Sequence, residues 1–402
     1  MTVANLRKPE LMAPAGDMIS LRAALEAGAD AVYFGVVSMN MRASAKNFAA
    51  AEMHEIARIC RDYRAKAYLA MNTIIYDNEL QLAEDLIKEA VLAGIDAVIC
   101  WDFAILEIAL RHGIEVFVST QMSVANSASL IFLYRNFGIK RFVLARECTL
   151  EEIVSIRGNL RQQLGEAAEK IELEVFAHGA MCVSLSGRCF MSQIVFNKSA
   201  NRGECRQPCR REYEIRDVRD GKEFLLGRDY VMSPRDLCTL PFLEKLLAAG
   251  IDSLKIEGRG RSPEYVSEVT ACYRALIDFY YENCQSESFV KELETLKKTL
   301  MQRLDAVFHR GFSDGFYFGR QIGEWSGGNG SKATHRKVHV GVVTNFFKKV
   351  MVAEIKVEGT GFAQGDELMF QGAATGVVTQ IAESLEVVLK PVERAEKNSM
   401  VG

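Results

Sequence analysis

The sequence lacks the long apolar runs that would place the protein in or beyond a membrane. No stretch approaches the roughly 18 consecutive apolar residues of a membrane-spanning helix. Met1–Lys8 is followed by no apolar run of signal-peptide length. The formal net charge is only -3, so the chain as a whole has no strong attraction to nucleic acid or to anionic lipid. We therefore expect a soluble, cytoplasmic protein with no membrane partner, whose nucleic-acid contacts come from local basic patches.

Several common catalytic motifs are also absent. No G-x-S-x-G sequence occurs, and His54 and Glu55 are not followed by a second histidine at the metalloprotease spacing. The glycine-rich run at 327–332 lacks the residue order of a phosphate-binding loop. Pro14–Asp17 stands after the first apolar run, where a dinucleotide-binding enzyme would have G-x-G-x-x-G. The sequence thus contains no motif of a protease, an NTPase or a dinucleotide-binding enzyme.

What the sequence does contain is a repeated junction of a helical stretch, a glycine and a short apolar strand. Glycine just past a helix favours the left-handed conformation, and a short apolar run suits a buried parallel strand. Eight such strand–helix units predict a (β/α)8 TIM-like barrel, with a doubly wound open sheet as the alternative. The predicted strands are Glu10–Ala13, Ala31–Phe34, Ala67–Met71, Ala97–Cys100, Val116–Val118, Phe142–Leu144, Glu174–Phe176 and Ser253–Ile256.

The composition also predicts how the chain divides. We expect the barrel domain to span residues 1–325, interrupted at 177–238 by an insert rich in cysteine and arginine. Tyr265–Tyr281 and Phe289–Leu304 read as long helices, and the Gly- and Ser-rich stretch Gly323–Lys332 as a linker. Short alternating strands then predict a small all-β, barrel-like domain at 336–396.

Four of the ten cysteines lie close together in the insert. Cys182, Cys189, Cys205 and Cys209 have the spacing C-x6-C-x15-C-x3-C. Four thiolates can hold zinc or a 4Fe-4S cluster, and the wide first pair suits a loop around a cluster better than a zinc knuckle. We therefore predict an iron–sulfur centre, with zinc or no metal as the alternatives. Cys238 is an alternative fourth ligand, although a buried structural cysteine is the simpler interpretation.

Polar residues follow most of the predicted strands, and functional groups of a (β/α)8 barrel gather at those strand ends. Because guanidinium groups bind carboxylates in bidentate fashion, several arginines at one mouth predict a substrate with carboxylates. Taken singly, each residue is as often a loop salt bridge or a helix cap. The candidate catalytic residues are Asn72, Gln121, Glu147, His178 and Glu257, and the candidate substrate-binding residues are Arg42, Arg146, Lys255 and Arg259.

Two local basic patches stand out against the low net charge. Basic residues with interspersed aromatics can neutralise phosphates and stack unpaired bases, so these patches are candidate RNA-binding surfaces. A solvated charged face is the alternative, because acidic residues dilute the first patch. The candidates are Arg210 and Arg211 in the insert, and Lys332, Arg336 and Lys337 before the β domain.

The segment around the first two clustered cysteines, Glu174–Ser192, resembles the signature of the peptidase U32 family. Four shorter stretches resemble the same family: Leu11–Gly16, Ala29–Tyr33, Asn201–Arg210 and Lys255–Arg259. The resemblance covers nearly the whole chain. Despite the family name, it implies a hydroxylation protein that acts on transfer RNA, ribosomal RNA or a ubiquinone precursor without molecular oxygen.

The resemblance also implies cofactors and partners. Members of this kind bind a 4Fe-4S cluster through four cysteines, and Cys182, Cys189, Cys205 and Cys209 match those positions; a later cysteine replaces the last in some relatives, which keeps Cys238 as an alternative. For RNA-directed members, prephenate, a dicarboxylate, is the implied hydroxyl source. Length and the β domain favour the members that make 5-hydroxyuridine at the wobble position of tRNA. Electron-transfer or iron–sulfur assembly proteins are further implied partners, and a collagenase-like peptidase or an iron–sulfur scaffold remains the alternative.

Overall fold

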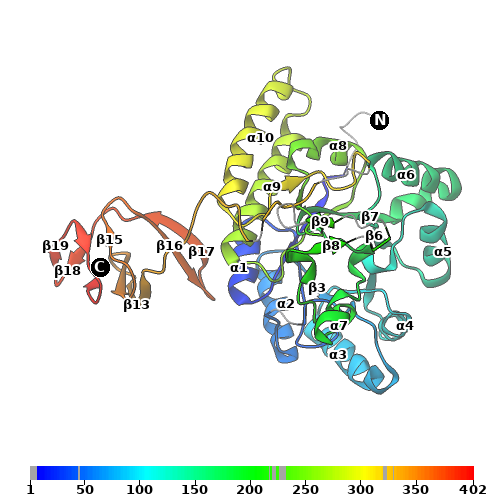
Figure 1. The fold of residues 1–402 in the computed structure, drawn as a ribbon, viewed down its shortest axis with the longest axis horizontal. Helices are drawn as coiled ribbons and strands as arrows, with labels where there is room; N and C mark the ends of the chain where they lie inside the picture. Colours follow the sequence, from blue (N-terminus) through cyan, green and yellow to red (C-terminus); the bar gives the residue numbers. More distant parts are fainter. Residues whose placement is uncertain are drawn as a thin grey trace.

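The barrel at the centre of the computed structural model is closed. The structure describes residues 7–43, 46–216, 218–219, 223–225, 232–319, 324–328 and 330–402. Eight strands pair in parallel in chain order, and the last pairs with both its predecessor and the first (Figure 1). They are β1 (Glu10–Pro14), β2 (Ala31–Phe34), β3 (Lys66–Ala70), β4 (Ala97–Cys100), β5 (Glu115–Val118), β6 (Arg141–Val143), β7 (Glu172–Gly179) and β11 (Ser253–Ile256).

The (β/α)8 prediction is confirmed, and the open sheet is wrong, because β11 closes the ring between β7 and β1. Seven of the eight predicted strands match within one residue at each end, whereas β7 is longer on both sides. The glycine junctions also match: Gly94 and Gly138 end their helices in the left-handed conformation, with φ of 77° and 70°. Short buried runs after a helix therefore sufficed to locate the barrel strands.

Helices cover the outside of the barrel (Figure 1). Several begin at a side chain that accepts an N–H of the first turn, as Asp17 does from Ser20 at 2.8 Å. The predicted long helices fall within α9 and α10. The helices are α1 (Met18–Glu26), α2 (Met53–Asp62), α3 (Leu80–Ala93), α4 (Phe103–Arg111), α5 (Ser127–Phe137), α6 (Leu150–Leu164), α8 (Leu243–Ala248), α9 (Pro263–Asn283) and α10 (Phe289–Ala306); short 3-10 turns are η2 (Ala50–Glu52), η3 (Asp77–Glu79), η4 (Thr120–Met122), η5 (Gly165–Lys170) and η9 (Leu240–Phe242).

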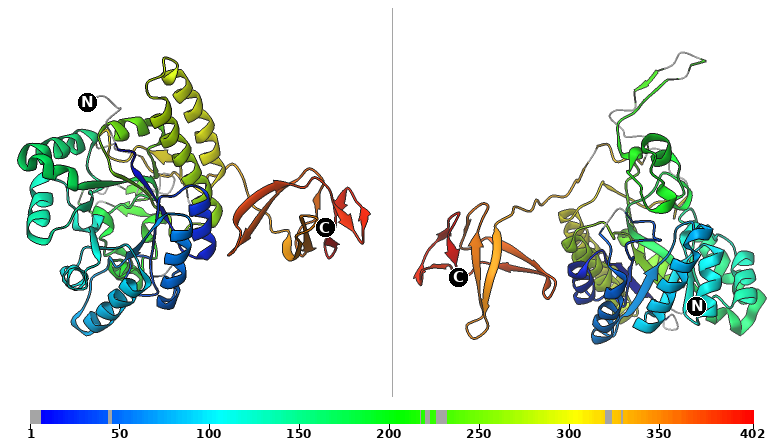
Figure 2. Two further views of the ribbon diagram at one scale, coloured as in Figure 1. Left: turned by 180° about the vertical axis from the view of Figure 1, so that it is seen from behind. Right: turned by 90° about the horizontal axis from the view of Figure 1, so that it is seen from below.

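The insert stands on one end of the barrel, where β7 ends and before β11 begins (Figure 2, right). The chain returns from it in β10 (Asp236–Cys238), which runs antiparallel to the end of β7 and parallel to β12 (Phe312–Ser313). The insert contains η6 (Leu185–Gly187), α7 (Met191–Phe196), η7 (Ala200–Arg202), η8 (Pro208–Arg210) and the pair β8 (Glu214–Arg216) and β9 (Glu223–Leu225). Residues 217, 220–222 and 226–231 of the insert lie outside the described residues.

The C-terminal part forms small antiparallel sheets beside the barrel (Figure 1), as the sequence predicted. Its own core includes Val357, Phe362 and Ala395. The strands are β13 (Gly341–Phe347), β14 (Val352–Val357), β15 (Phe362–Ala363), β16 (Glu367–Gly372), β17 (Gly376–Ile381), β18 (Glu386–Val387), β19 (Lys390–Pro391), β20 (Arg394–Ala395) and β21 (Met400–Val401). The domain limits at 325 and 336 stay predictions, and Gly323 and Asn329 of the predicted linker lie outside the described residues.

The β part contacts the barrel at α1 and α9. Arg22 of α1 donates to the carbonyl of Ala373 at 2.5 Å, in the turn between β16 and β17. Glu264 of α9 accepts from Gln371 at 2.8 Å and from Lys337 at 2.6 Å. In the described part of the chain, no helix is both long and apolar enough to cross a membrane.

The lumen of the barrel is apolar in its middle and charged at its lower end, by which we mean the end where the strands begin. Met12, Tyr68 and Phe117 meet inside, since side chains of a strand alternate between the lumen and the helix layer. Below them, Arg141 donates to Glu10 at 2.5 Å and to Glu172 at 2.7 Å. The Arg141 guanidinium also lies 4.3 Å from the centre of the Phe117 ring.

Replacing this arginine tests how much the charged lower end contributes to stability. We expect Arg141→Met to lower the free energy of unfolding by about 3–5 kcal/mol, because it removes the buried cation that the part-buried carboxylates of Glu10 and Glu172 share. Arg58→Met is the control: Arg58 pairs with Asp62 on an exposed helix face, where a pair contributes less than about 0.5 kcal/mol. Urea unfolding of both variants at pH 7 measures the difference, and equal losses would contradict the structural role of Arg141.

Candidate active site at the barrel mouth

A cavity of about 380 Å³ lies at the carboxyl ends of the barrel strands, between the barrel and the insert. Its barrel side carries Asn72, Gln121 and other residues that follow the strands. Its insert side carries the four clustered cysteines. Gly203 sets the approach of the insert: a Cβ there would lie 2.1 Å from the carbonyl oxygen of Asn40, so only glycine allows this contact.

The structure brings most of the candidate barrel residues to this cavity. Seven of the nine line it, which are Arg42, Asn72, Gln121, Arg146, Lys255, Glu257 and Arg259. Asn72 and Gln121 form an amide pair on one wall, with 3.3 Å between Asn72 Nδ2 and Gln121 Oε1. Amides cannot exchange protons near neutral pH, so these two side chains can orient a bound polar group but cannot act as acid or base.

Glu257 is the one acidic side chain among the described residues that line the cavity. Arg42 Nη2 donates to Glu257 Oε1 at 2.6 Å. Burial alone would raise the pKa of Glu257, but the guanidinium groups of Arg42, Arg261 and Arg146 outweigh it and lower the pKa to about 2. Glu257 is therefore ionised near neutral pH, where it fixes Arg42 and cannot donate a proton.

Two guanidinium groups on the barrel side of the cavity have no carboxylate within ion-pair distance among the described residues. Arg146 Nη1 donates to the carbonyl of Ala180 at 2.8 Å. Arg259, which is 6% exposed, donates to Asn40 Oδ1 at 3.0 Å. Burial lowers the pKa of both, that of Arg259 to about 10, so both remain charged near neutral pH. Buried charges without a counter-charge create a site for an anion.

Lys255, the last of the predicted substrate-binding cations, has its charge neutralised by a carboxylate deeper in the barrel. Lys255 Nζ lies 2.9 Å from Oε1 of the fully buried Glu174. Burial lowers the pKa of Lys255, and the Glu174 carboxylate opposes this shift. Lys255 thus connects the charged lower lumen to the floor of the cavity, and a bound anion would compete with Glu174 for it.

His178, a candidate catalytic residue, does not line the cavity. Phe176 of β7 pairs with Lys255 of β11, but His178 pairs with the next residue, Ile256, so Ala177 is an extra residue on β7. Such a bulge turns the following side chain to the other face of the strand. His178 consequently lies in the core, 2% exposed, with Nδ1 3.4 Å from the hydroxyl of Tyr273. Burial lowers the pKa of His178 to about 3, which keeps the ring neutral.

Glu147 also lies outside the cavity lining and supports the insert instead. Its Oε1 accepts the backbone N–H of Ser186 at 3.2 Å. Ser186 lies between Cys182 and Cys189, and its hydroxyl also contacts Ser123 at 3.2 Å. Glu147 therefore positions the first cysteine loop against the barrel, and its catalytic role stays a prediction.

The four clustered cysteines share one wall of the cavity. The N–H of Ser184 points to Cys182 Sγ at 3.4 Å, and the N–H of Met191 points to Cys189 Sγ at 3.3 Å. Burial raises the pKa of the Cys209 thiol to about 11, Arg210 lowers it, and the other three thiols raise it further. All four thiols thus line the same cavity wall.

The arrangement of the thiols bears on which group they can hold. Among the described residues, no group of three or more His, Cys, Asp or Glu side chains is arranged so that it could hold a metal ion. A 4Fe-4S cluster contacts each cysteine through a different iron, so its thiols stand farther apart than those around one zinc ion. The structure shows the four thiols along one wall of the cavity, and the iron–sulfur centre stays a prediction.

Cys238 is separated from this wall. It lies on β10, 2% exposed, with its Sγ 3.9 Å from Met301 Sδ, and it does not line the cavity. Cys209 does line it, in the middle of the short turn η8. The structure thus groups Cys209, and not Cys238, with the other three cysteines.

Comparison with known proteins identifies the family of the chain. The model of Peptidase family U32 matches residues 16–327. The chain belongs to this family.

Its relatives within the U32 family have names from two classes. A collagenase of Porphyromonas gingivalis is 40% identical over 99% of this chain and 94% of that protein. An uncharacterized protease of Methanocaldococcus jannaschii is 40% identical over 98% of this chain and 94% of that protein. The tRNA hydroxylation protein P1 of Bacillus subtilis is 34% identical over 94% of this chain and 87% of that protein. Family membership alone therefore does not choose between proteolysis and RNA hydroxylation.

The candidate RNA-binding residues of this U32 protein lie in different settings. Arg210 is a clamp: its guanidinium donates to Ser233 Oγ and to the carbonyls of Pro234 and Met181 at 2.7–2.8 Å. Arg211 is exposed, with its guanidinium 4.6 Å from the centre of the Phe196 ring. Lys337 pairs with Glu264, whereas Lys332 and Arg336 are exposed. Arg210 therefore holds the insert, and the other four stay candidates for RNA contact.

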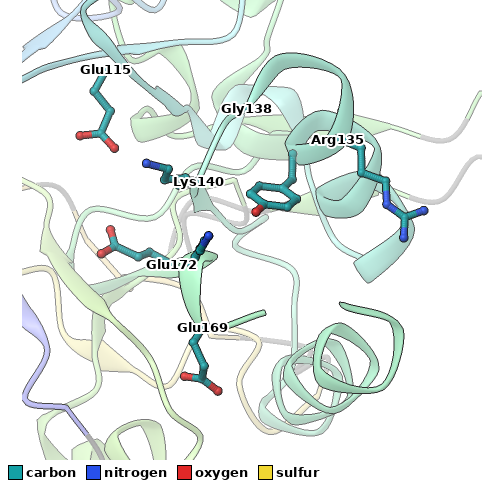
Figure 3. Close-up of a pocket in the computed structure, with 8 residues that line it drawn as sticks. Glu115, Arg135, Gly138, Lys140, Glu169 and Glu172 are labelled. Carbon is teal, nitrogen blue, oxygen red and sulfur yellow. The ribbon is translucent and has the colours of Figure 1, made fainter. Parts of the chain in front are cut away.

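A wider depression of about 810 Å³ lies at the opposite end of the barrel, before β5, β6 and β7 begin (Figure 3). Glu115, Glu169 and Glu172 line it together with Arg135, Lys140 and Lys170, so its charges balance. Active sites of (β/α)8 barrels lie at the other end, where the strands finish. This depression therefore has neither the position nor the charge of the mouth cavity.

Two arginines of the cavity were not among the sequence predictions. Arg261 follows Arg259 by two residues, so the run of basic residues after β11 could have indicated it. Arg310 comes from beyond α10, far from any predicted strand end, and no sequence signal pointed to it. Tertiary structure alone places Arg310 at the mouth.

The choice between Cys209 and Cys238 as fourth ligand can be tested directly. We expect protein purified without oxygen to contain about four irons per chain. Cys209→Ser should lose most of this iron, because a serine hydroxyl is a far poorer ligand than a thiolate. Cys238→Ser is the matched control and should retain it. Iron and sulfide assays with visible absorbance spectra provide the measurement, and the reverse pattern would assign the ligand role to Cys238.

Proposed function

We propose that this U32 protein is an RNA-modifying hydroxylation enzyme that works with a small dicarboxylate and a 4Fe-4S cluster at the barrel mouth. The observation that carries the proposal is that one cavity combines two guanidinium groups without a carboxylate partner and four cysteine thiols. The name of the Bacillus subtilis relative supports RNA as the substrate.

The charges of the cavity favour a dianionic small molecule. Arg42 and Lys255 have carboxylate partners, so their charges are already balanced. Arg146 and Arg259 donate to neutral groups only among the described residues, and each can hold a carboxylate in bidentate fashion. A dicarboxylate would restore the charge balance of the buried site. Prephenate, which the family resemblance suggested, is the dicarboxylate that we propose.

The cysteine wall gives the second element of the proposal. Cys182, Cys189, Cys205 and Cys209 would hold the cluster, and the N–H groups of Ser184 and Met191 would stabilise its negative charge. A bound cluster would supply one-electron redox chemistry at the cavity wall. Around it, Asn72 and Gln121 orient polar groups, and the insert limits the access of water to the cavity.

RNA is the third element, and the basic segment before the β sheets supports it. Residues 331–339 are almost all exposed, and they run from the barrel mouth to the contact between Lys337 and Glu264. Lys332 and Arg336 on this segment can neutralise phosphates of a strand that approaches the cavity. As the finer form of the proposal, the product is 5-hydroxyuridine at the wobble position of tRNA.

Peptide hydrolysis is the second candidate, because the two relatives at 40% identity are named collagenase and protease. The cavity chemistry weighs against it. None of the six histidines, all of which the structure describes, lines the cavity, so its cysteines have no imidazole base. Glu257 is held ionised by Arg42 and is occupied by that pairing. We therefore rank hydrolysis below hydroxylation.

The first functional prediction concerns Arg146 and Arg259, the two arginines that we propose bind the dicarboxylate. We expect Arg146→Ala and Arg259→Ala each to lower 5-hydroxyuridine in tRNA about a hundredfold or more, because each loses a buried bidentate contact. Iron content and RNA binding should remain close to those of the wild type. Arg58→Ala, on the outer face of α2, is the control for removal of an arginine.

The measurement is nucleoside mass spectrometry of tRNA from a strain that lacks the gene and carries each variant. Full modification by both arginine variants would mean that the dicarboxylate binds elsewhere. A wild-type gene that restores no hydroxyuridine would overturn the tRNA assignment. Cleavage of gelatin by the wild type, lost in the arginine variants, would favour the peptidase instead.

The basic segment generates a second functional prediction. We expect Lys332→Gln and Arg336→Gln together to weaken tRNA binding and to reduce the slope of log affinity against log salt by roughly 1.4 to 1.8, since each phosphate contact contributes about 0.7 to 0.9. The matched double variant Arg58→Gln and Lys66→Gln removes two positive charges from residues whose side chains lie far from the mouth. Filter binding across a salt series measures both, and identical slopes would exclude the segment from the RNA interface.

A further inference from the structure

Two arginines at one side of the cavity share a single carboxylate. Asp236, at the start of β10, is 1% exposed. Its two oxygens lie 3.5 Å from Arg261 Nη2 and 3.4 Å from Arg310 Nη1. Arg210, which holds the insert, also lines the cavity. Burial lowers the pKa of Arg310, and the positive charge of Arg210 lowers it further. Asp236 is thus the only carboxylate within ion-pair distance of the Arg261 and Arg310 guanidinium groups among the described residues.

Arg261 and Arg310 are positioned by Phe308 and Asp236. Most of their N–H groups donate to no acceptor among the described residues. The Arg261 guanidinium lies 3.9 Å, and that of Arg310 5.1 Å, from the centre of the Phe308 ring. Each guanidinium has five N–H donors. Among the described residues, each of the two guanidinium groups donates a single hydrogen bond, and both donate it to Asp236. Their side chains are 14% and 12% exposed and line the cavity, so the remaining donors are available to a ligand there.

The positive charge continues from this pair toward the surface. Gly311 follows Arg310 directly, and a Cβ at Gly311 would lie 3.5 Å from both Arg235 Cδ and Lys332 Nζ. Lys332 begins the exposed basic segment that reaches the β sheets. A row of cations that starts inside the cavity and continues along the surface matches the regular charges of a nucleic-acid strand. By contrast, Arg146 and Arg259 lie among neutral acceptors and match a compact dianion.

We propose that Arg261 and Arg310 form a phosphate subsite, which binds the backbone phosphate next to the nucleotide that enters the cavity. This inference rests on the proposed RNA substrate and adds to it the residues that recognise the strand at the point of reaction. Asp236 positions the two guanidinium groups, and Phe308 supports them. The dicarboxylate and the phosphate then occupy different arginine pairs of one cavity.

The test is a binding cycle with a stem-loop RNA that carries a uridine at the first anticodon position. One version has natural phosphates, and two others carry a single uncharged methylphosphonate on the 5′ or the 3′ side of that uridine. We expect one of the two substitutions to weaken binding to the wild type about tenfold, the effect of losing a charge-assisted contact. Arg310→Gln and Arg261→Gln should weaken binding of the natural RNA by a similar factor, and should no longer distinguish the natural from the substituted RNA.

Arg274→Gln is the matched control, because its side chain is 15% exposed, pairs with Asp30, packs against Gly28 and does not line the cavity. It should bind all three RNAs as the wild type does. Thermal melting checks that each variant folds. If Arg310→Gln does not fold, Arg310→Lys is the second variant at this position. Because the lysine keeps the charge, it should retain part of the discrimination.

Three outcomes would overturn the subsite. If the arginine variants discriminate the methylphosphonate as strongly as the wild type does, the phosphate binds elsewhere. If they lose prephenate binding in calorimetry and keep the discrimination, the pair belongs to the dicarboxylate. If the wild type binds natural and substituted RNA equally, no phosphate is recognised beside the uridine. Failure of the wild type to bind any of the RNAs is a different result, which removes the proposed function itself.

Discussion

The pairing of β7 with β11 is the constraint on which both the fold and the candidate site depend. It closes the barrel, because β11 also pairs with β1. The extra residue Ala177 lets Phe176 and Lys255 face the lumen while His178 turns into the core. Beyond that bulge, the end of β7 pairs with β10, the strand on which the chain returns from the insert. One strand therefore closes the barrel and also holds the cysteine-bearing segment over its mouth.

Charge is distributed unequally along the lumen, and this contrast identifies the mouth as the end that binds anions. At the lower end Arg141 lies between Glu10 and Glu172, so the buried charges compensate one another. At the mouth Arg146 and Arg259 have no carboxylate within ion-pair distance among the described residues and hydrogen-bond to neutral groups. Uncompensated buried charge destabilises a fold. A site of this kind is retained where a ligand supplies the missing charge, and its stability then depends on that ligand.

The sequence predicted the barrel well because its strands are short apolar runs bounded by helix-ending glycines, which are local signals. Side chains that directly follow those strands, such as Arg146 and Glu257, could be predicted to reach the mouth for the same reason. His178 could not be excluded from the mouth by sequence, because no residue pattern indicates the one-residue bulge that turns its side chain to the other face of β7. Arg310 could not be found, because its position depends on the chain path after α10. The separation of Cys238 from Cys209 likewise depends on β10 packing against the core.

The difference in names among the relatives has a physical explanation that bears on function. Identity over a whole (β/α)8 chain mostly counts core and helix positions, which determine the fold, whereas chemistry depends on a few residues at the mouth. The 40% and 34% relatives therefore cannot be ranked as functional guides by identity alone. The mouth of this protein presents guanidinium groups and thiols and no imidazole. Such groups bind anions and ligate metal clusters, whereas hydrolysis of a peptide needs a base beside its nucleophile. The residues of the mouth thus favour hydroxylation of an anionic substrate for this chain, even though its two relatives at 40% identity have names that refer to proteolysis.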